Sequence, residues 1–128
     1  MSEIKILKIE PGEEPTVIKI KNDLKSMQGI VDGYIEAVYP FDDPIALICN
    51  EEGKINNLKL NRALRNPDTG EISDIIAGTF FIAFAPPNTD EFKSLSDDLI
   101  AKYSEIFRYP EEFYRDFNNN IIAVKIKK

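Results

Sequence analysis

Apolar and polar residues partly alternate in two stretches near the start of the chain, Ile4 to Ile9 and Thr16 to Ile20. Both stretches are rich in β-branched residues, a composition typical of strands. The dipeptide Pro11-Gly12, which favours a tight turn, lies between them. The pattern therefore predicts an N-terminal β-hairpin.

A helical spacing follows this hairpin. The apolar residues recur at intervals of three and four: Leu24, Met27, Ile30 and Val31. Such intervals place side chains on one face of a helix. Asn22 has the chemistry of an N-cap, and Asp32-Gly33 is suited to end the helix. We expect a short helix lying across the sheet.

Three further apolar runs predict strands. Tyr34 to Tyr39 and Ile45 to Cys49 are joined by a turn-forming PFDDP segment. Every residue from Ile45 to Cys49 is apolar, which indicates a strand buried on both faces with Cys49 at its buried end. The most apolar strand is expected within Ile75 to Ala85, at Thr79 to Phe84, and Pro86-Pro87 ends it. It is the best candidate for a central strand.

The remaining segments have less uniform patterns. Ser94 is a candidate N-cap for a second helix that carries an apolar stripe as far as Phe107. The tail 118–128 predicts a last strand at a sheet edge, where its lysines would discourage pairing with another chain. Residues 54–65 have no sustained period and are expected to form a loop with one helical turn near 61–64. Residues 66–70 predict a turn.

These elements indicate an α+β fold: one small antiparallel or mixed β-sheet with two helices packed on it. The chain has 128 residues, of which 43% are hydrophobic and 30% charged. This size suits a single domain, 1–128, that needs no disulfide or metal to hold its core.

Composition removes several classes of function. The formal net charge of −6 makes nucleic acid an unlikely partner, because binding to phosphate backbones requires clustered Lys and Arg. With no histidine and one cysteine, the familiar zinc, Cys-His and Ser-His-Asp sites are excluded. No apolar run is long enough to span a membrane and the start lacks the order of a secretory signal, so a cytoplasmic protein is expected.

Cys49 and the adjacent carboxylate pairs are the first candidates for chemistry. Glu51 and Glu52 would raise the pKa of the Cys49 thiol, so an inert buried cysteine is the expected interpretation. Four pairs of acidic residues are expected to be solvated in turns: Asp42-Asp43, Glu51-Glu52, Asp97-Asp98 and Glu111-Glu112. No cofactor and no metal site is predicted.

The segment Lys54 to Arg65 is the stronger candidate for a binding site, because it combines amide and guanidinium groups in a stretch that is expected to be irregular and exposed. The predicted binding residues are Asn50, Lys54, Asn57, Asn61, Arg62 and Arg65. The alternative is that the asparagines satisfy turns of their own loop and the segment is scaffolding.

Two pieces of sequence carry a resemblance to a known family. A short helix feeds GYIE at residues 33–36, and NEEGK at 50–54 is followed by LNR at 60–62. Over residues 4–107 the chain resembles a family of small uncharacterised proteins that share a domain of unknown function. The resemblance implies a protein of phages, plasmids, integrative elements or their Gram-positive hosts, and it transfers no activity. Residues 114–128 form a C-terminal extension beyond it.

The leading functional hypothesis is a non-catalytic protein–protein interaction or inhibitor module that binds a host or self protein through the face around Asn50 to Arg65. The alternative is a binder of a nucleotide-like small ligand, with Arg62, Arg65 and Lys54 as cations and Tyr34 or Tyr39 as stacking faces. An enzyme that uses only carboxylates comes third. The oligomeric state stays open, because Thr79 to Phe84 could be central to one chain or abut another.

Overall fold

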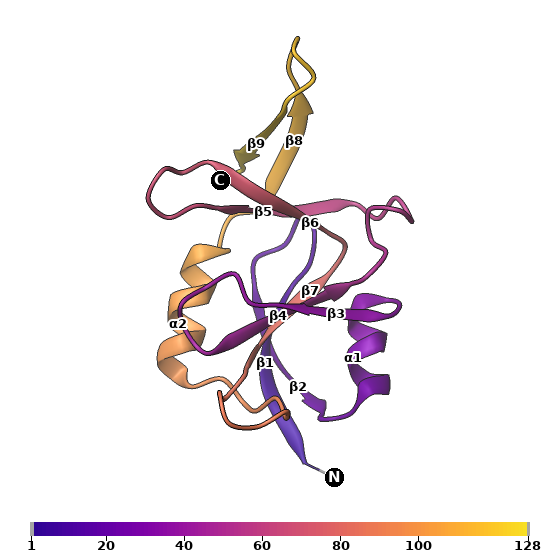
Figure 1. Ribbon diagram of the computed structural model, residues 1–128, viewed down its shortest axis with the longest axis vertical. Coiled ribbons are helices and arrows are strands. Elements are labelled where there is room, and N and C mark those ends of the chain that lie inside the picture. The colour runs from indigo at the N-terminus through magenta and orange to yellow at the C-terminus, as the bar shows by residue number, and fades with distance from the viewer. Residues whose placement is uncertain (1, 128) are drawn as a thin grey trace.

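A five-stranded antiparallel sheet forms the centre of the protein (Figure 1). The computed structural model describes residues 2–127. Met1 and Lys128, the two ends of the predicted domain, lie outside the described residues. Lys128 is also the end of the predicted last strand. The strands follow the order β2 (Thr16–Lys21), β1 (Glu3–Ile9), β7 (Phe80–Phe84), β4 (Ile45–Asn50) and β3 (Ile35–Val38).

Two helices and two further hairpins surround this sheet. The helices are α1 (Leu24–Val31) and α2 (Asp97–Ile106). Strand β5 (Leu60–Arg65) pairs with β6 (Ile72–Ala77), and β8 (Glu111–Arg115) pairs with β9 (Ile121–Lys125). The α+β prediction is roughly consistent with this arrangement. The main sheet is larger than the one small sheet expected, and the two hairpins form sheets of their own.

Each face of the central sheet has its own core. Side chains alternate along β4, so Leu47 packs into one core and Ile48 into the other. Helix α1 covers the face of Ile48 through Met27 and Val31. The opposite face is covered by α2 and by the β5–β6 hairpin (Figure 1). Burial on both faces explains why β4 consists of apolar residues until Asn50.

The most apolar strand lies where the sequence predicts it. β7 is the middle strand and pairs with both β1 and β4, so that Ile82 lies opposite Leu7 on one side and Leu47 on the other. The predicted N-terminal hairpin and the strand 34–39 are also confirmed, as β1–β2 and β3. Because both edges of β7 are paired within one chain, this strand does not abut a second copy.

The N-cap of α1 differs from the prediction by one residue. The carboxylate of Asp23, not the amide of Asn22, accepts the N–H of Ser26 at 2.8 Å. Asn22 instead donates to the carbonyl of Phe92 at 3.0 Å, a contact that a local pattern does not reveal. The predicted end of the helix is confirmed, because Asp32 adopts the left-handed conformation with φ 61°.

The N-cap of α2 also differs from the prediction, because the predicted residue has a partner in a distant segment. Ser96 caps the helix and accepts the N–H of Leu99 at 3.2 Å. The predicted cap, Ser94, accepts the N–H of Lys5 at 2.8 Å and so ties the segment to β1. Two serines thus satisfy different backbone donors, and only the one adjacent to the helix caps it.

The prediction of a loop with a helical turn in residues 54–65 is wrong from Leu60 onward. Leu60–Arg65 is strand β5, and Asn61 and Arg62 are fully buried. A buried strand with polar residues at its centre has no apolar run or alternation by which to recognise it. The turn at 66–70 is confirmed, with Gly70 at positive φ.

The sequence predicts the C-terminal strand but not its partner. β9 is a strand, as expected, and it pairs with β8 rather than with the main sheet. The β8–β9 hairpin projects from the body, and β8 packs against β5 at its base (Figure 1).

Candidate functional site

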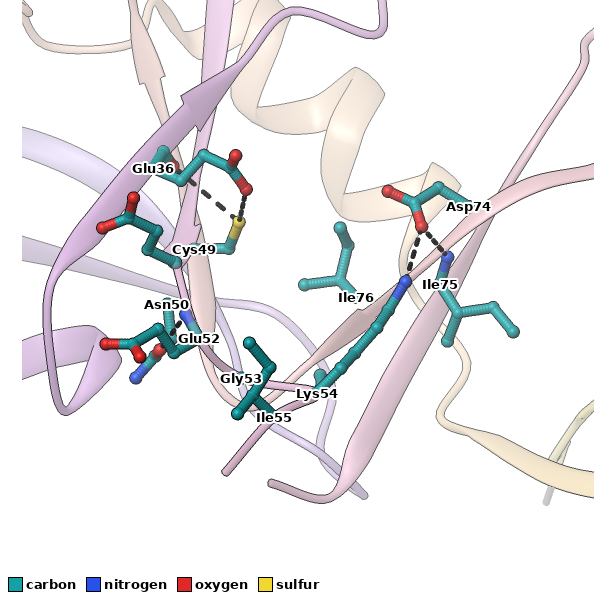
Figure 2. Close-up of a pocket in the computed structure, with 12 residues that line it drawn as sticks. Glu36, Cys49, Asn50, Glu52, Gly53, Lys54, Ile55, Asp74, Ile75 and Ile76 are labelled. Carbon is teal, nitrogen blue, oxygen red and sulfur yellow. Dashed lines mark hydrogen bonds and ion pairs between the residues drawn. The ribbon is translucent and has the colours of Figure 1, made fainter. Parts of the chain in front are cut away.

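A hollow of about 270 Å³ opens beside the end of β4 (Figure 2). Its walls come from three places: Glu36 of β3, the segment Cys49–Ile55, and Asp74–Ala77 of β6. It contains the NEEGK segment at 50–54, the most distinctive local motif of the sequence. This juxtaposition exists because β3 pairs with β4 while the β5–β6 hairpin folds back over the same end.

Cys49 forms part of the wall of this hollow. Its side chain is buried, and its thiol lies 3.8 Å from the carbonyl and 3.9 Å from the carboxylate of Glu36, both acceptors (Figure 2). Burial raises the pKa of the Cys49 thiol to about 11, with a further contribution from the negative charges of Glu36 and Asp74. The predicted inert thiol is therefore supported. The responsible carboxylates are these two and not Glu51 and Glu52.

Lys54 and Asp74 close the hollow on the side of β6. The ammonium of Lys54 lies 2.8 Å from the Asp74 carboxylate, which also accepts the backbone N–H of Ile75 (Figure 2). Gly53 makes this closure possible, because a Cβ at that position would lie 2.8 Å from the carbonyl oxygen of Ala77. The loop and β6 can touch only where the side chain is absent.

The hollow is acidic. Lys54 is the one cation among the described residues that line it, and its charge is offset by Asp74. Three further lining carboxylates form no ion pair with the described residues: Glu36, Glu51 and Glu52. The exposed side chain of Ile55 stands on the rim, 77% accessible. An anion is disfavoured here, whereas an ammonium or guanidinium group finds several acceptors.

Asn50 is a structural residue as well as a lining residue. Its amide donates to the carbonyls of Val31 and Asp32 at 3.0 and 3.1 Å, which satisfies the C-terminus of α1. Its side-chain oxygen accepts the N–H of Glu52 at 2.7 Å. Asn50 thus fixes the start of the NEEGK turn relative to the helix, and its functional groups are already engaged.

Asn61 and Arg62 lie away from the hollow, in the interior. The amide of Asn61 donates to the carbonyls of Ile9 and Gly78, both at 2.9 Å. The guanidinium of Arg62 donates to the carbonyl of Phe107 at 3.0 and 3.2 Å and to that of Glu13 at 2.5 Å. The expected exposure of both residues is wrong, because carbonyls in the first hairpin, between β6 and β7, and at the end of α2 provide their partners.

Arg65 and Asn57 occupy two further environments. Arg65 makes a two-pronged ion pair with Glu111 of β8, at 2.6 and 3.2 Å. Asn57 is exposed in the turn before β5, with φ 57°. Of the six predicted binding residues, the structure therefore brings Asn50 and Lys54 together at the hollow and places the other four elsewhere.

Sequence inspection missed Glu36 and Asp74, since neither belongs to an acidic pair or to the predicted segment. A signal for Glu36 was available, because it is the one charged residue in the GYIE strand. Two members of the acidic pairs also depart from the solvated-turn expectation. Asp43 accepts from Lys102 and Tyr103, both at 2.6 Å, and Glu111 is buried against Arg65. The contacts of Asp43 with Lys102 and Tyr103 hold α2 in place, and the ion pair of Glu111 with Arg65 holds β8 in place.

Among residues 2–127, no group of three or more Cys, Asp or Glu side chains is arranged to hold a metal ion. None of the helices in that range is long and apolar enough to cross a bilayer. The carboxylates that line the hollow suit it to holding a cationic group by charge and hydrogen bonds.

The comparisons with known proteins identify a family and no activity. The family described as "Domain of unknown function (DUF3846)" matches residues 4–108, and the chain belongs to it. No curated protein and no solved structure matches the chain. The matched region includes the whole hollow and ends before the β8–β9 hairpin.

Proposed function

Starting from a family without an assigned activity, we propose that this chain is a non-catalytic protein–protein interaction module whose acidic hollow receives a basic side chain of the partner. One observation carries the proposal: Glu36, Glu51 and Glu52 line a small hollow without an ion-pair partner among the described residues, while Lys54 is engaged by Asp74. A Lys or Arg side chain complements this charge, and Ile55 beside it offers an apolar contact.

The chemistry of the hollow supports binding over catalysis. With its pKa raised to about 11, Cys49 is a protonated thiol at neutral pH and a poor nucleophile. The chain has no histidine to act as its base. The proposed partner is a host protein or a protein encoded with this one. The proposed setting, which rests on the sequence resemblance, is the cytoplasm of a bacterium that carries a phage or mobile element.

A nucleotide-like ligand receives less support from the same geometry. The three cations proposed for it do not converge: Arg62 is buried, Arg65 binds Glu111, and Lys54 binds Asp74. A phosphate group in the hollow would meet uncompensated carboxylates. Non-specific association with nucleic acid is disfavoured for the same reason, and no membrane partner is proposed.

The test compares partner capture by two double variants. Glu36→Gln with Glu52→Gln removes charge from the hollow and keeps side-chain size, whereas Glu71→Gln with Glu91→Gln removes the same charge from two exposed turns. The hollow variant is expected to bind the partner with an affinity about fivefold to tenfold lower, and the control variant to bind it with unchanged affinity. Carbodiimide, which joins carboxylates to amines, should cross-link the hollow to a lysine of the partner when that residue is Lys.

Equal affinity of the two double variants for the partner would overturn the proposal. A thermal-shift screen with nucleotides tests the alternative in parallel. We expect no change in Tm, and a rise of several degrees at excess nucleotide would favour the small-ligand function instead.

A further inference from the structure

The β8–β9 hairpin displays apolar side chains that the rest of the chain does not cover. Its register pairs Tyr114 with Ile122, and their exposed fractions are 53% and 45%. Val124, on the same face, is 43% exposed, and Phe117 at the turn is fully exposed. The opposite face, which includes Phe113 and Ala123, is more buried.

The outer edge of β9 is open. Hydrogen bonds from Ile126 to the carbonyl of Pro110 and from Asp116 to the carbonyl of Asn120 fix the phase of the ladder. In an antiparallel pair the bonded positions alternate, so the backbone groups of three β9 residues point away from β8: Ile121, Ala123 and Lys125. Among the described residues no strand pairs with this edge, which is therefore available to another β-strand.

The sequence of β9 is self-complementary in an antiparallel register centred on Ala123. This register places Ile121 opposite Lys125 of the second copy and Ile122 opposite Val124, so apolar residues meet and the lysines do not face each other. The edge strand β2 behaves differently. The bond from Asn22 to the carbonyl of Ser2 makes Val17, Lys19 and Lys21 its outward residues, and centred pairing would place Lys19 opposite Lys19.

The distribution of charge also favours association at this end. Residues 1–108 contain 12 basic and 19 acidic residues, whereas residues 109–128 contain four basic and three acidic residues. The excess negative charge therefore lies in the body of the protein. Two copies that approach through their bodies repel each other, and two that approach through the hairpins do not.

We propose that two copies of this chain associate by antiparallel pairing of their β9 strands about Ala123, which joins the two hairpins into a four-stranded sheet. The proposal is independent of the acidic hollow, which lies on other elements. A pair of five-residue strands makes a small interface, so the dimer is expected to dissociate on dilution. The lysines of the tail, predicted to discourage pairing with another chain, are compatible with this register.

Sedimentation velocity on the full chain tests this association over about 5 to 500 μM protein, a range that brackets the micromolar dissociation constants of small interfaces. We expect a concentration-dependent shift from monomer to dimer. Ala123→Pro removes an outward N–H and leaves the bonds to β8 in place, so it should abolish the shift. The matched control is Val17→Pro, which removes an outward N–H from the edge of β2 and should leave the shift unchanged. Circular dichroism confirms that both variants fold.

A charge exchange provides a second readout that does not depend on proline. Ile122→Lys with Val124→Lys should prevent self-association, as should Ile122→Glu with Val124→Glu, and an equimolar mixture should recover a heterodimer. A monomer throughout the concentration range would overturn the proposal. It would also be overturned by a dimer that survives Ala123→Pro, or by charge variants that do not recover association when mixed.

Discussion

The guanidinium of Arg65 on β5 donates two hydrogen bonds to the carboxylate of Glu111 on β8, and the Glu111 side chain is only 3% exposed. This ion pair is the polar link between the family-matched body and the hairpin that follows it. Parallel bonds between a guanidinium and a carboxylate fix orientation as well as distance. The pair therefore determines where the hairpin stands.

Arg65→Met is expected to release the hairpin by leaving Glu111 buried without its cation, at a cost of about 3 kcal/mol. Hydrogen exchange should show faster exchange in β8 and β9 while the central sheet keeps its protection. The double variant Arg65→Met with Glu111→Met removes both charges and should cost less than the single one. Equal exchange in β7 and β9 of the single variant would contradict this local role.

Arg62 is expected to be essential for stability. Its guanidinium satisfies carbonyls at the C-terminus of α2 and in the first hairpin, and burial lowers its pKa, an effect that the negative charge of Glu111 offsets only in part. Arg62→Met should lower the free energy of unfolding by more than about 3 kcal/mol, because several buried carbonyls lose a charged donor. Urea denaturation measures the loss.

The exposed Arg115 on β8 is the matched control for Arg62. Among residues 2–127 its guanidinium has hydrogen bonds only to Asn119 in the hairpin turn. Arg115→Met should change the free energy of unfolding by about 0.5 kcal/mol or less. Similar losses for the two substitutions would contradict the burial of the Arg62 guanidinium.

The Cys49 thiol is expected to resist alkylation at neutral pH. Burial first, and the charges of Glu36 and Asp74 second, raise its pKa to about 11 from an ordinary value of 9.0. The thiol is protonated below that pKa, so the rate of reaction with iodoacetamide should rise with a midpoint near 11 in the folded protein. In urea the midpoint should fall to about 9.0.

Glu36→Gln separates the two causes of this shift. It removes one negative charge and leaves the thiol buried, so the alkylation midpoint should fall but stay above 9.0. The contribution of this shift to stability is present below pH 9 and is lost as the pH rises toward 11. A midpoint near 9 in the folded protein would refute the buried, acidic environment.

Two glycines are expected to respond to alanine with opposite signs. Gly53→Ala forces a Cβ against the carbonyl of Ala77 and should cost about 1–3 kcal/mol as the loop moves off β6. Gly29→Ala lies on the exposed side of α1 with open space around it, and should stabilise the protein by about 0.5–1 kcal/mol. Thermal unfolding of the two variants checks both. Stabilisation by Gly53→Ala would mean that the loop does not touch β6.

The candidate site was only partly accessible to sequence reasoning. The motif at 50–54 marked Asn50 and Lys54, because a turn with a glycine and adjacent charges follows an apolar strand. Glu36 and Asp74 face the same hollow from two different strands: pairing of β3 with β4 places Glu36 opposite Cys49, and packing of the β5–β6 hairpin over the end of β4 brings Asp74 there. No spacing along the chain encodes that meeting. The direction of the Cys49 pKa shift was predicted correctly, but from the wrong carboxylates.

By itself, the sequence determined the elements that the local pattern of apolar residues predicts: the first hairpin, the doubly buried β4, the central β7 and the two helices. Such segments lose free energy by leaving water, whatever their partners are. Tertiary structure decided the fate of polar side chains. Arg62 and Asn61 became interior residues, and Glu111 an anchor, because carbonyls and charges from remote segments were there to satisfy them. Burying a polar group costs free energy unless it forms a hydrogen bond or an ion pair, and the fold decides which group is close enough to be its partner.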